Sequence, residues 1–314
     1  METDLTQSRM NLLLTFDRNF LQHGVVMLRS LFYNNPSVGF NIYIYTEDKE
    51  VVSEKLSKEF EQESAKFIFI DFDQSRFPKL KTKFHYGEGY YKIIYLRLNI
   101  GEVLPDLDRI LLIDVDLVVN GDISEFYEQD LGDNEIMAAV AEVRPSNFKK
   151  FGIEPEKRNA KTNFNCGVTL VDLKKWRDWG VSKKAVDHII KYEDILAAPT
   201  QDTLNPLFYN NWKICLPKYN LHHFYLQYPF KIEDLPYTKD EIKDSIENPI
   251  IVHYSGAMRP WEYLDINPYS YLYWKYLNMT SYNGYSYRDR NLKNFLTRWS
   301  RFLKVKISRI GIYK

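Results

Sequence analysis

Residues 109–116 read Arg-Ile-Leu-Leu-Ile-Asp-Val-Asp, and this stretch indicates both the fold class and the place where chemistry is expected. Its apolar run does not alternate with polar residues, which is typical of a strand in a sheet covered on both faces. Residues 10–16, 40–45 and 66–71 repeat that character upstream. Helix-like patterns fill the intervals, so we expect an α/β domain with a mostly parallel sheet flanked by helices.

The same patterns continue toward the C-terminus. Strand-like runs are expected at residues 136–143, 168–171 and 249–254, and helix-like runs at 91–104, 174–179 and 183–192. No internal repeat or low-complexity linker interrupts them. We therefore expect one α/β domain over residues 10–280, followed by an appended tail at 288–314.

Composition narrows the class of protein. The 314 residues carry 42 Lys or Arg and 42 Asp or Glu, and this zero net charge argues against a nucleic-acid partner. Cys166 and Cys215 are too few for a disulfide framework, so a reducing compartment is expected. No apolar run approaches the roughly 18 residues of a membrane span, and residues 1–4 do not begin a secretory signal. We expect a soluble protein of the cytoplasm.

The zero net charge conceals a basic C-terminal segment. Residues 288–314 contain nine Lys or Arg and a single acid, Asp289. The preceding part therefore has a net charge of −8 and the segment +8. Basic charge concentrated at one end of an acidic protein predicts an anionic partner for that end.

Apolar side chains recur in this segment at three- and four-residue steps, which places them on one face of a helix. They are Leu292, Phe295, Leu296, Trp299, Phe302, Leu303, Ile307 and Ile310. Because most basic residues lie off that stripe, the tail has the make-up of a helix lying on an anionic membrane surface. The protein would then be peripherally associated with the inner face of the cell membrane. A final helix packed on the domain, with a solvated basic face, is the alternative.

Three Asp-x-Asp pairs occur, at 71/73, 106/108 and 114/116. The pair at 106/108 precedes its strand and is expected in a loop, whereas the other two follow apolar strands. Ligands of open α/β sheets collect beyond the carboxyl ends of strands, where two carboxylates can share a divalent ion with substrate phosphates. Residues i and i+2 of a strand face the same way, so both acids of a pair would converge on one ion. Spacing alone does not choose between 71/73 and 114/116, and solvated strand-end acids are the alternative for either.

The stretch at residues 110–119 also looks like the first motif of haloacid-dehalogenase-like phosphatases, in which a nucleophilic Asp is followed by an acid Asp. Those enzymes have the motif on their first strand and a later acidic pair for magnesium. Here several strand-like units come before it, and no such acidic pair follows.

A set of ordered motifs resembles glycosyltransferase family 8, in particular bacterial lipopolysaccharide galactosyl- and glucosyltransferases and, more distantly, glycogenin. The resemblance covers roughly residues 10–261. Its motifs are Thr15-Phe16-Asp17-Arg18-Asn19-Phe20, Tyr95-Leu96-Arg97-Leu98, Leu112-Ile113-Asp114-Val115-Asp116, Phe164-Asn165-Cys166-Gly167-Val168, Asp172-Leu173-Lys174-Lys175-Trp176, Gln201-Asp202-Thr203-Leu204-Asn205 and His253-Tyr254-Ser255-Gly256-Ala257-Met258-Arg259-Pro260-Trp261.

The resemblance implies a GT-A fold with a Rossmann-like sheet, a UDP-sugar donor, and retention of anomeric configuration. It also implies Mn²⁺ as the cofactor, with Mg²⁺ as the alternative ion. Asp114, Asp116 and His253 match the metal ligands. Two carboxylates and an imidazole leave coordination positions for two phosphate oxygens, and the ion offsets charge that builds on the leaving UDP. Without the resemblance, His253 would be assigned as a hydrogen-bonded strand histidine, and the other histidines keep that assignment.

The remaining donor contacts also follow from the resemblance. Gly256 and Arg259 match a loop that closes over the diphosphate, with Arg259 where relatives often have Lys. The residues that match the uracil, ribose and sugar contacts are Thr15, Asp17, Asn19, Phe20, Arg97, Val115, Asn165 and Asp202. For Phe20, which would stack on the base, a purely structural place in the core is an equal alternative.

Gln201 and Asp202 are the expected catalytic residues. Gln201 matches the position nearest the face where a covalent nucleophile would have to lie. An amide is a poor nucleophile, so same-face attack through a short-lived oxocarbenium-like state is favoured over double displacement. Relatives commonly carry an acid just before this Gln. In this sequence Thr200 occupies that position instead. Glu142 is the candidate for a further sugar-binding acid.

Three functions are therefore compared. The first is a metal-dependent retaining glycosyltransferase that moves galactose or glucose to a glycan or glycolipid acceptor, in surface polysaccharide or glycolipid synthesis. The second is a haloacid-dehalogenase-like phosphohydrolase, and the third is a non-catalytic carbohydrate-binding relative, which would be expected to have lost its metal ligands. The acceptor is expected to meet the loops at residues 145–161 and 219–236.

Overall fold

The computed structural model describes residues 9–73, 75, 77–78, 88–145, 148–153, 162–209, 211–227, 235–256, 259–287 and 289–312. Its strands are β1 Met10–Thr15, β2 Phe40–Tyr45, β3 Ala65–Phe69, β4 Arg109–Ile113, β5 Leu117–Val119, β6 Met137–Pro145, β7 Thr162–Asp172, β8 Trp212–Cys215, β9 Leu221–His222 and β10 Ile251–His253.

Helices connect and cover these strands. The α-helices are α1 Leu21–Asn34, α2 Lys49–Glu59, α3 Glu88–Leu98, α4 Ile100–Val103, α5 Ser124–Tyr127, α6 Leu173–Asp178, α7 Val181–Tyr192, α8 Pro199–Leu207, α9 His223–Gln227, α10 Lys239–Glu247, α11 Ser270–Leu277 and α12 Leu292–Ile312. The 3₁₀ turns are η1 Arg18–Phe20, η3 Phe148–Phe151, η4 Glu193–Ile195 and η5 Pro217–Tyr219.

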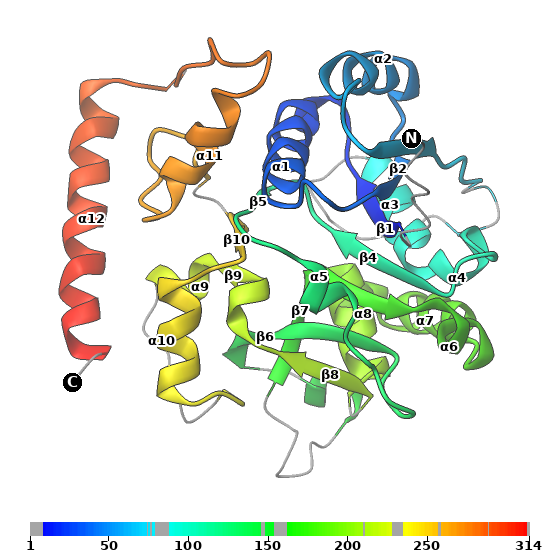
Figure 1. The fold of residues 1–314 in the computed structure, drawn as a ribbon. Helices are drawn as coiled ribbons and strands as arrows, with labels where there is room; N and C mark the ends of the chain where they lie inside the picture. The colour runs from blue at the N-terminus through cyan, green and yellow to red at the C-terminus, as the bar shows by residue number, and fades with distance from the viewer. Residues whose placement is uncertain are drawn as a thin grey trace.

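The main sheet has seven strands in the order β3-β2-β1-β4-β7-β6-β8. Strands β1, β2, β3 and β4 are mutually parallel, and β8 is parallel to β6. Strand β7 runs antiparallel to both β4 and β6. Helices lie on both faces of the sheet (Figure 1). The predicted α/β fold with a mostly parallel, helix-flanked sheet is confirmed.

The apolar runs of β1, β2 and β4 became largely buried strands because both faces of the sheet are covered there. The expectation of a buried strand was wrong for β3, which lies at the edge of the sheet and leaves Ile68 exposed. Leu12, Leu14, Leu111 and Ile113 are all fully buried. A helix also differs from its prediction: the expected helix at residues 91–104 is divided into α3 and α4. The division comes at Asn99, whose backbone leaves the helical region (φ −110°, ψ 21°).

The sheet positions a site at the ends of β1 and β4. The chain first moves outward from β1 to β2 and β3, and then returns to the other side of β1 as β4. Neighbouring crossovers therefore leave the sheet in opposite directions at this point. Such a reversal of strand order opens a crevice at the carboxyl ends of the strands, where ligands of this sheet type bind.

A second, three-stranded sheet has the order β5-β10-β9. Its strand β5 continues directly from β4 after a short connection, and β10 pairs antiparallel with it, His253 opposite Leu117. Its fully buried Val118 and Val252 pack with Val26 of α1 and with α11 in a separate apolar cluster. The small sheet therefore brings the end of β10 next to the end of β4.

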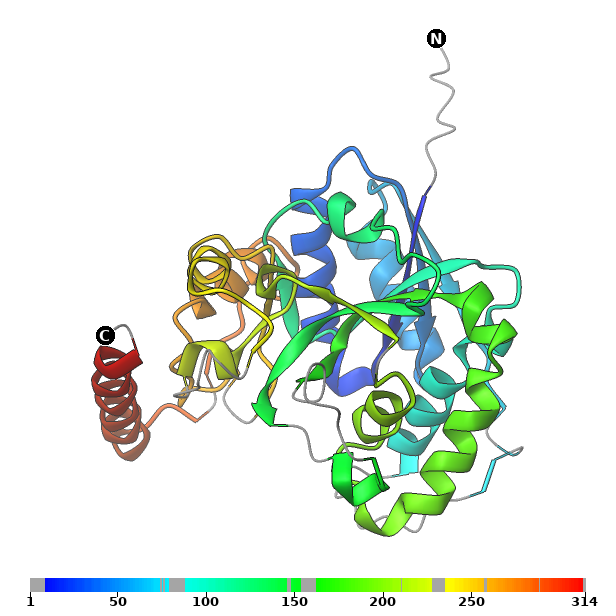
Figure 2. The same ribbon diagram turned by 90° about the horizontal axis from the view of Figure 1, so that it is seen from below.

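The C-terminal helix α12 lies at the edge of the molecule in two perpendicular views (Figures 1 and 2). Its side chains Leu292, Leu296 and Trp299 are exposed. Among the described residues, none of the helices has both the length and the apolar character that crossing a membrane requires. The predicted helix is thus present with an uncovered apolar face, and the domain limits at 280 and 288 stay predictions.

Candidate functional site

Asp114 and Asp116 lie in the connection between β4 and β5. The Asp114 amide donates to the carbonyl oxygen of Gly167 on β7 (2.8 Å), and the Tyr254 amide donates to the carbonyl oxygen of Asp116 (2.8 Å). The expectation that strand pleating brings the two acids together was wrong, because β4 ends at Ile113. Backbone hydrogen bonds to β7 and to the residue after β10 hold the connection instead.

His253, the last residue of β10, completes a three-residue cluster with these acids. Its Nε2 lies 3.2 Å from Oδ1 of Asp116 and 3.9 Å from Oδ2 of Asp114. One ligand atom from each residue lies within 4.8 Å of the others. Two carboxylates and an imidazole are a donor set suited to Mn²⁺ or Mg²⁺ with phosphate oxygens. The residues present therefore fit the divalent ion that the sequence predicts.

Because Gly167 has no side chain, His253 and Asp114 can occupy the space beside it. A Cβ atom at residue 167 would lie 2.3 Å from Cε1 of His253 and 2.9 Å from Oδ2 of Asp114. Both distances are below van der Waals contact, so a larger residue would displace two of the candidate ligands. The glycine is part of the predicted motif at 164–168, and close packing explains why this position has no side chain.

Opposite charges shift the pKa values of the cluster. Burial alone would raise the pKa of the Asp116 carboxyl, but His253 and Arg259 lower it to about 2. Burial alone would lower the pKa of His253, but the carboxylates of Asp116 and Asp114 outweigh burial and raise it above its usual value. The Asp116 carboxyl is therefore held ionised, as a carboxylate ligand of a metal must be.

Two arginines flank the carboxylates. Arg97 of α3 forms an ion pair with Asp114, and its Nε donates to Oγ1 of Thr15 (3.3 Å). The terminal nitrogen Nη2 of Arg259 lies 3.7 Å from Oδ2 of Asp116. Guanidinium groups at this position are suited to bidentate contact with phosphate oxygens.

A cavity of about 510 Å³ opens beside the three-residue cluster. Its lining includes the predicted donor-site residues Thr15, Asp17, Phe20, Arg97, Asp114, Val115, Asp116 and Arg259, together with Phe16, Tyr45, Thr46, Glu47, Ile93, Ile94 and Thr200. Predicted donor contacts at the ends of β1 and β4, on α3 and after β10 are thereby brought together in one cavity. Tyr45, Thr46 and Glu47 at the end of β2 were not anticipated from the sequence.

The turn after β1 presents Phe20 to this cavity. Oδ1 of Asp17 accepts hydrogen bonds from the amides of Asn19 (2.9 Å) and Phe20 (3.2 Å), and Oδ2 accepts from the side-chain amide of Asn19 (3.2 Å). Asp17 therefore caps the turn η1, and Asn19 is held at its exposed side. Phe20 is half-buried against the core, which leaves part of its ring accessible.

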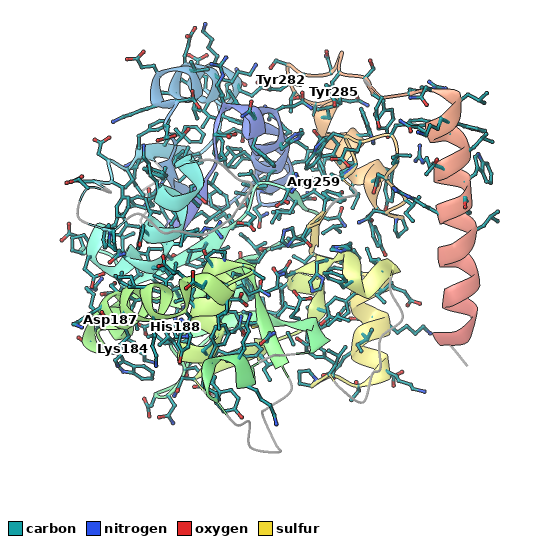
Figure 3. All side chains as sticks on the ribbon, turned by 180° about the vertical axis from the view of Figure 1, so that it is seen from behind. Lys184, Asp187, His188, Arg259, Tyr282 and Tyr285 are labelled. Atoms are coloured by element: carbon teal, nitrogen blue, oxygen red, sulfur yellow. The ribbon has the colours of Figure 1, made fainter. Side chains whose placement is uncertain are left out.

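Arg259 lies between two aromatic rings near the middle of the molecule (Figure 3). Its guanidinium carbon is 5.3 Å from the centre of the Phe20 ring and 5.6 Å from that of Trp261. Trp261 stacks on His23 at 3.6 Å. Burial, with a further contribution from Arg259, lowers the pKa of His23 to about 3, so this ring is a neutral packing element.

A second cavity, of about 190 Å³, contains the predicted catalytic residues. Its lining includes Gln201, Asp202, Glu142, Lys150, Asn163, Asn205, Phe148 and Phe151. Oδ2 of Asp202 accepts from the amides of Ala197 (2.6 Å) and Ala198 (3.1 Å) and from Nζ of Lys150 (3.1 Å). Sequence analysis did not single out Lys150, because nothing near residue 150 indicates a partner 52 positions away.

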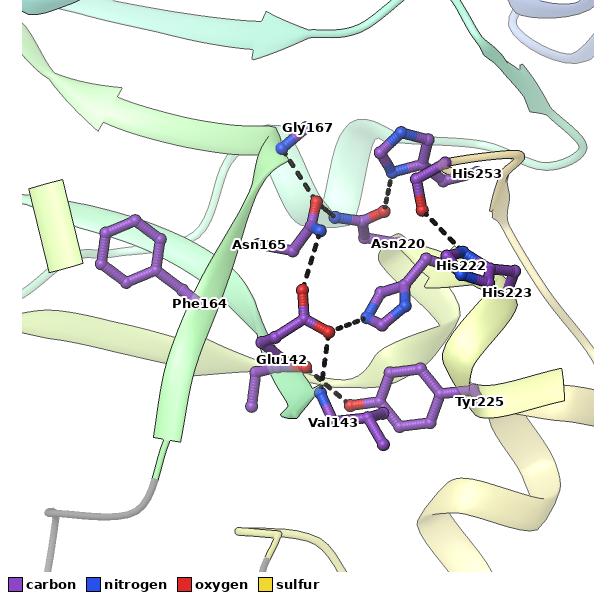
Figure 4. Close-up of polar contacts among 12 residues, drawn as sticks. Glu142, Val143, Phe164, Asn165, Gly167, Asn220, His222, His223, Tyr225 and His253 are labelled. Atoms are coloured by element: carbon purple, nitrogen blue, oxygen red, sulfur yellow. Dashed lines mark hydrogen bonds and ion pairs between the residues drawn. The ribbon is translucent and has the colours of Figure 1, made fainter. Parts of the chain in front are cut away.

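Glu142 and Asn165 lie in a buried polar network, shown in Figure 4. Glu142 is 2% exposed and Asn165 8%. Nδ2 of Asn165 donates to Oε2 of Glu142 at 3.3 Å. Their predicted sugar contacts stay predictions, and the network adds Asn220, which the sequence did not indicate.

Gly256 follows the small sheet with a φ of +103°, which only glycine adopts without strain. A Cβ there would lie 2.8 Å from Cε1 of His223. Residues 257–258 of the same predicted motif lie outside the described residues. So do residues 146–147 and 154–161 of the first expected acceptor loop and 228–234 of the second.

The other acidic pairs lie apart from this site. The Asp71 side chain is 88% exposed and pairs with Lys49, and Asp108, 85% exposed, pairs with Arg177. Geometry thus selects 114/116 among the three pairs. Of the other histidines, His188 lies on α7, well away from Arg259 (Figure 3), and His85 lies outside the described residues.

Comparison with known proteins gives a family match. Residues 11–265 match the model of glycosyl transferase family 8. The chain is 25% identical over 275 residues to general stress protein A of Bacillus subtilis, which covers 85% of this chain and 92% of that protein. It is 27% identical over 266 residues to the lipopolysaccharide 1,2-glucosyltransferase of Escherichia coli, covering 84% of this chain and 76% of that one.

Solved structures give the same fold. The galactosyltransferase LgtC, crystallised with donor and acceptor sugar analogues, superposes with a TM-score of 0.71 at 20% identity. The superposition covers 87% of this chain and 96% of LgtC. At this identity the likeness concerns the arrangement of the backbone.

Proposed function

The chain belongs to glycosyltransferase family 8, and we propose that it is a retaining, metal-dependent hexosyltransferase. It would move galactose or glucose from a UDP-sugar to a glycan or glycolipid acceptor, in surface polysaccharide or glycolipid synthesis. The observation that carries this proposal is the Asp114–Asp116–His253 cluster beside a cavity of about 510 Å³. The family match also sets aside the haloacid-dehalogenase-like alternative, and the intact ligand set argues against a non-catalytic relative.

Asp114, Asp116 and His253 would hold Mn²⁺, or Mg²⁺ as the alternative. When bound, the ion would neutralise charge on the diphosphate and stabilise the UDP leaving group. Arg97 and Arg259 already face the carboxylates, so each is placed to exchange a carboxylate partner for a phosphate oxygen. The aromatic face of Phe20 would receive the uracil, and Thr15, Asp17, Asn19 and Val115 would line the nucleoside end.

The sugar would project toward the second cavity, where Gln201 and Asp202 lie. Gln201 carries an amide, which is too weak a nucleophile for a covalent intermediate, so we favour attack of the acceptor on the face that UDP leaves. The Asp202 carboxylate accepts three hydrogen bonds and is held in place to contact sugar hydroxyls. Glu142 and Asn165 would complete the sugar side of the pocket, and Gly256 would allow close approach of backbone to the diphosphate.

We also propose that α12 holds the enzyme at the inner face of the cell membrane. Its apolar side chains Phe295, Leu296, Trp299, Phe302 and Leu303 are exposed. Basic residues accompany them on an otherwise acidic chain, and a helix of this composition favours an anionic lipid surface over water. A cytoplasmic location would give the enzyme access to nucleotide sugars on that side.

A donor screen tests the proposed function. The purified chain is incubated with Mn²⁺ and each of a panel of nucleotide sugars, with and without glycan acceptors, and release of the nucleoside diphosphate is measured. UDP-galactose or UDP-glucose should release UDP, and GDP- and ADP-sugars should not. Release of inorganic phosphate from phosphomonoesters, with no reaction of any UDP-sugar, would contradict the proposal.

A further inference from the structure

The candidate metal ligand His253 is hydrogen-bonded, on the side of its ring away from the carboxylates, to the buried side-chain amide of Asn220. Its Nδ1 lies 2.9 Å from Oδ1 of Asn220, while its Nε2 faces Asp116 and Asp114. His253 is 2% exposed and Asn220 is fully buried, so no solvent competes for these atoms. Whether Nδ1 carries a proton therefore depends on which atom of the Asn220 side chain faces it.

The orientation of these amides follows from one backbone group. The amide of Gly167 is a fixed donor, and it lies 2.9 Å from Oδ1 of Asn165. The oxygen of Asn165 therefore faces Gly167, and its Nδ2 is left to donate to the Glu142 carboxylate at 3.3 Å. The first assignment needs no assumption about hydrogen positions, because a backbone N–H only donates. The second follows from it, because the other terminal atom of the Asn165 amide is then its nitrogen.

The same reasoning extends to Asn220. Its Nδ2 lies 3.0 Å from Oδ1 of Asn165, which is already an acceptor, so Nδ2 is the donor of that contact. The oxygen of Asn220 must then face His253, where it accepts a hydrogen bond from Nδ1–H (Figure 4). A proton is thereby fixed on Nδ1. A metal ion that binds would take the place of the Nε2 proton that faces Asp116, and would use the lone pair of Nε2.

We propose that Asn220 and Asn165 are positioning residues that fix the tautomer and ring orientation of His253 for the metal ion. They act as a relay anchored on the backbone of Gly167 and on the carboxylate of Glu142. Partners of this kind, behind a metal-ligating histidine, contribute to metal affinity without touching the ion. The inference rests on the proposed metal-dependent function.

The relay also joins the two sheets. Glu142 lies on β6, Asn165 and Gly167 lie on β7, and His253 ends β10 of the small sheet. Asn220 lies between η5 and β9. The hydrogen bonds of the two amides therefore fix His253, which the small sheet supplies, relative to the main sheet. A flip of either amide would set two donors or two acceptors against each other in a buried place.

Direct measurement of Mn²⁺ binding tests the proposal. The free Mn²⁺ signal in electron paramagnetic resonance gives the dissociation constant of the purified chain without any turnover. Asn220→Leu removes the acceptor for Nδ1–H, and we expect Mn²⁺ to bind about 10- to 100-fold more weakly. Asn220→Asp keeps an acceptor facing His253 but sets its second oxygen against Oδ1 of Asn165, so it should bind Mn²⁺ more tightly than Asn220→Leu and more weakly than the unchanged chain.

Asn35→Leu is the matched control. Asn35 is also a buried asparagine; its side chain accepts from the Ile123 amide (3.0 Å) and donates to the Leu31 carbonyl (2.9 Å) at the far end of α1. This variant should lose thermal stability but bind Mn²⁺ as the unchanged chain does. Equal affinity of Asn220→Leu and the unchanged chain would overturn the relay, and so would equal weakening by Asn220→Asp and Asn220→Leu.

A second measurement uses the unchanged chain and does not depend on the folding of any variant. In the Mg²⁺-loaded protein, ¹⁵N-resolved NMR of the His253 ring should show a proton on Nδ1 and none on Nε2. A proton on Nε2 would overturn the relay. If the unchanged chain binds neither Mn²⁺ nor Mg²⁺, the proposed function itself fails, which is distinct from a failure of the relay alone.

Discussion

Gly167 shapes the candidate metal site through its carbonyl oxygen, its amide and its lack of a side chain. Its carbonyl oxygen accepts the Asp114 amide (2.8 Å), and its own amide donates to Asn165 (2.9 Å). Its missing side chain gives His253 the space it occupies. One small residue on β7 therefore determines where two ligands lie, and substitution there should affect the metal before it affects the fold.

Gly167→Ala tests this role. The added Cβ would lie 2.3 Å from Cε1 of His253, so the ring must move away from the carboxylates. We expect Mn²⁺ affinity, measured by titration, to fall at least about 10-fold. Gly284→Ala is the control, because no atom lies within 4 Å of its Cβ. Unchanged affinity in Gly167→Ala would contradict the site geometry.

Asp116→Asn tests the metal pair itself. An amide does not replace an anionic ligand, and a lost charge contact of this kind costs about 3–4 kcal/mol of barrier, or about 10²–10³ in rate. Initial rates of sugar transfer measure the loss. Asp73→Asn is the control, because Asp73 is exposed and lies outside the cavities. Loss of turnover in Asp73→Asn, with Asp116→Asn active, would mean that the wrong acidic pair had been chosen.

Sequence predicted the residues of the cluster but not the contacts that hold them. Asp114, Asp116 and His253 belong to ordered motifs, and their convergence follows the family resemblance. Asn220 lies in no such motif, and its partners Asn165 and His253 are 55 and 33 positions away. Contacts over that separation depend on how two sheets meet, and no local pattern of residues encodes this.

At the scale of elements, periodicity predicted β1, β2 and β4 because each is a short apolar run that is largely buried, and it also found β3, an edge strand that is only partly buried. It did not predict that β7 runs antiparallel to its neighbours, since a buried strand reads the same in either direction. The i, i+2 rule for strands was also applied to Asp114 and Asp116, whereas β4 ends before them. The backbone hydrogen bonds that hold the connection after β4 involve residues distant in sequence, Gly167 and Tyr254.

The segment before α11 contains a pH-sensitive carboxyl. Asp265 is 1% exposed, and it accepts hydrogen bonds from the amide of Asn267 (3.0 Å) and from the hydroxyl of Ser270. Burial raises its pKa from 3.8 to about 6. The folded protein therefore holds this proton more tightly than the unfolded chain does. The resulting stability is complete below pH 3.8 and is lost as the pH rises through about 6.

Asp265→Asn tests this linkage, because an amide has no charge to bury. At about 1.4 kcal/mol per pKa unit, the shift corresponds to about 3 kcal/mol. Between about pH 4 and pH 7.5 the unchanged chain should lose up to that much free energy of unfolding relative to the variant, as measured by urea denaturation. A difference between the two proteins that does not vary with pH would contradict the buried-carboxyl account.

Removal of α12 tests the proposed membrane contact. Truncation after Tyr287 should leave transfer to a soluble acceptor largely intact, because the apolar side chains of α12 are exposed rather than packed on the domain. The truncated chain should no longer sediment with liposomes that contain anionic lipid. Full-length protein with Trp299→Ser and Phe302→Ser should also bind such liposomes more weakly. Undiminished binding by the truncated chain, or its unfolding, would contradict the membrane anchor.

At the scale of the whole molecule, the relevant features are the distribution of charge along the chain and the place where the two sheets meet. The acidic part of the chain contains the two cavities, and α12, which carries most of the basic segment, lies at one edge (Figures 1 and 2). The candidate metal site lies where the main sheet meets the small one, so each sheet supplies part of it. Composition predicted the charge division, whereas the meeting of the sheets emerged only from the three-dimensional structure.

The central claim is metal-dependent transfer from a UDP-sugar with retained configuration, and one measurement tests it most directly. The chain is incubated with UDP-galactose or UDP-glucose and an acceptor, with Mn²⁺, with Ca²⁺, or with excess EDTA. Released UDP is counted, and the isolated product is analysed by NMR after the metal is removed. We predict one UDP per transferred hexose and an α-linked product in Mn²⁺, less in Ca²⁺, and none in EDTA. A β-linked product, or full turnover in excess EDTA, would contradict the account.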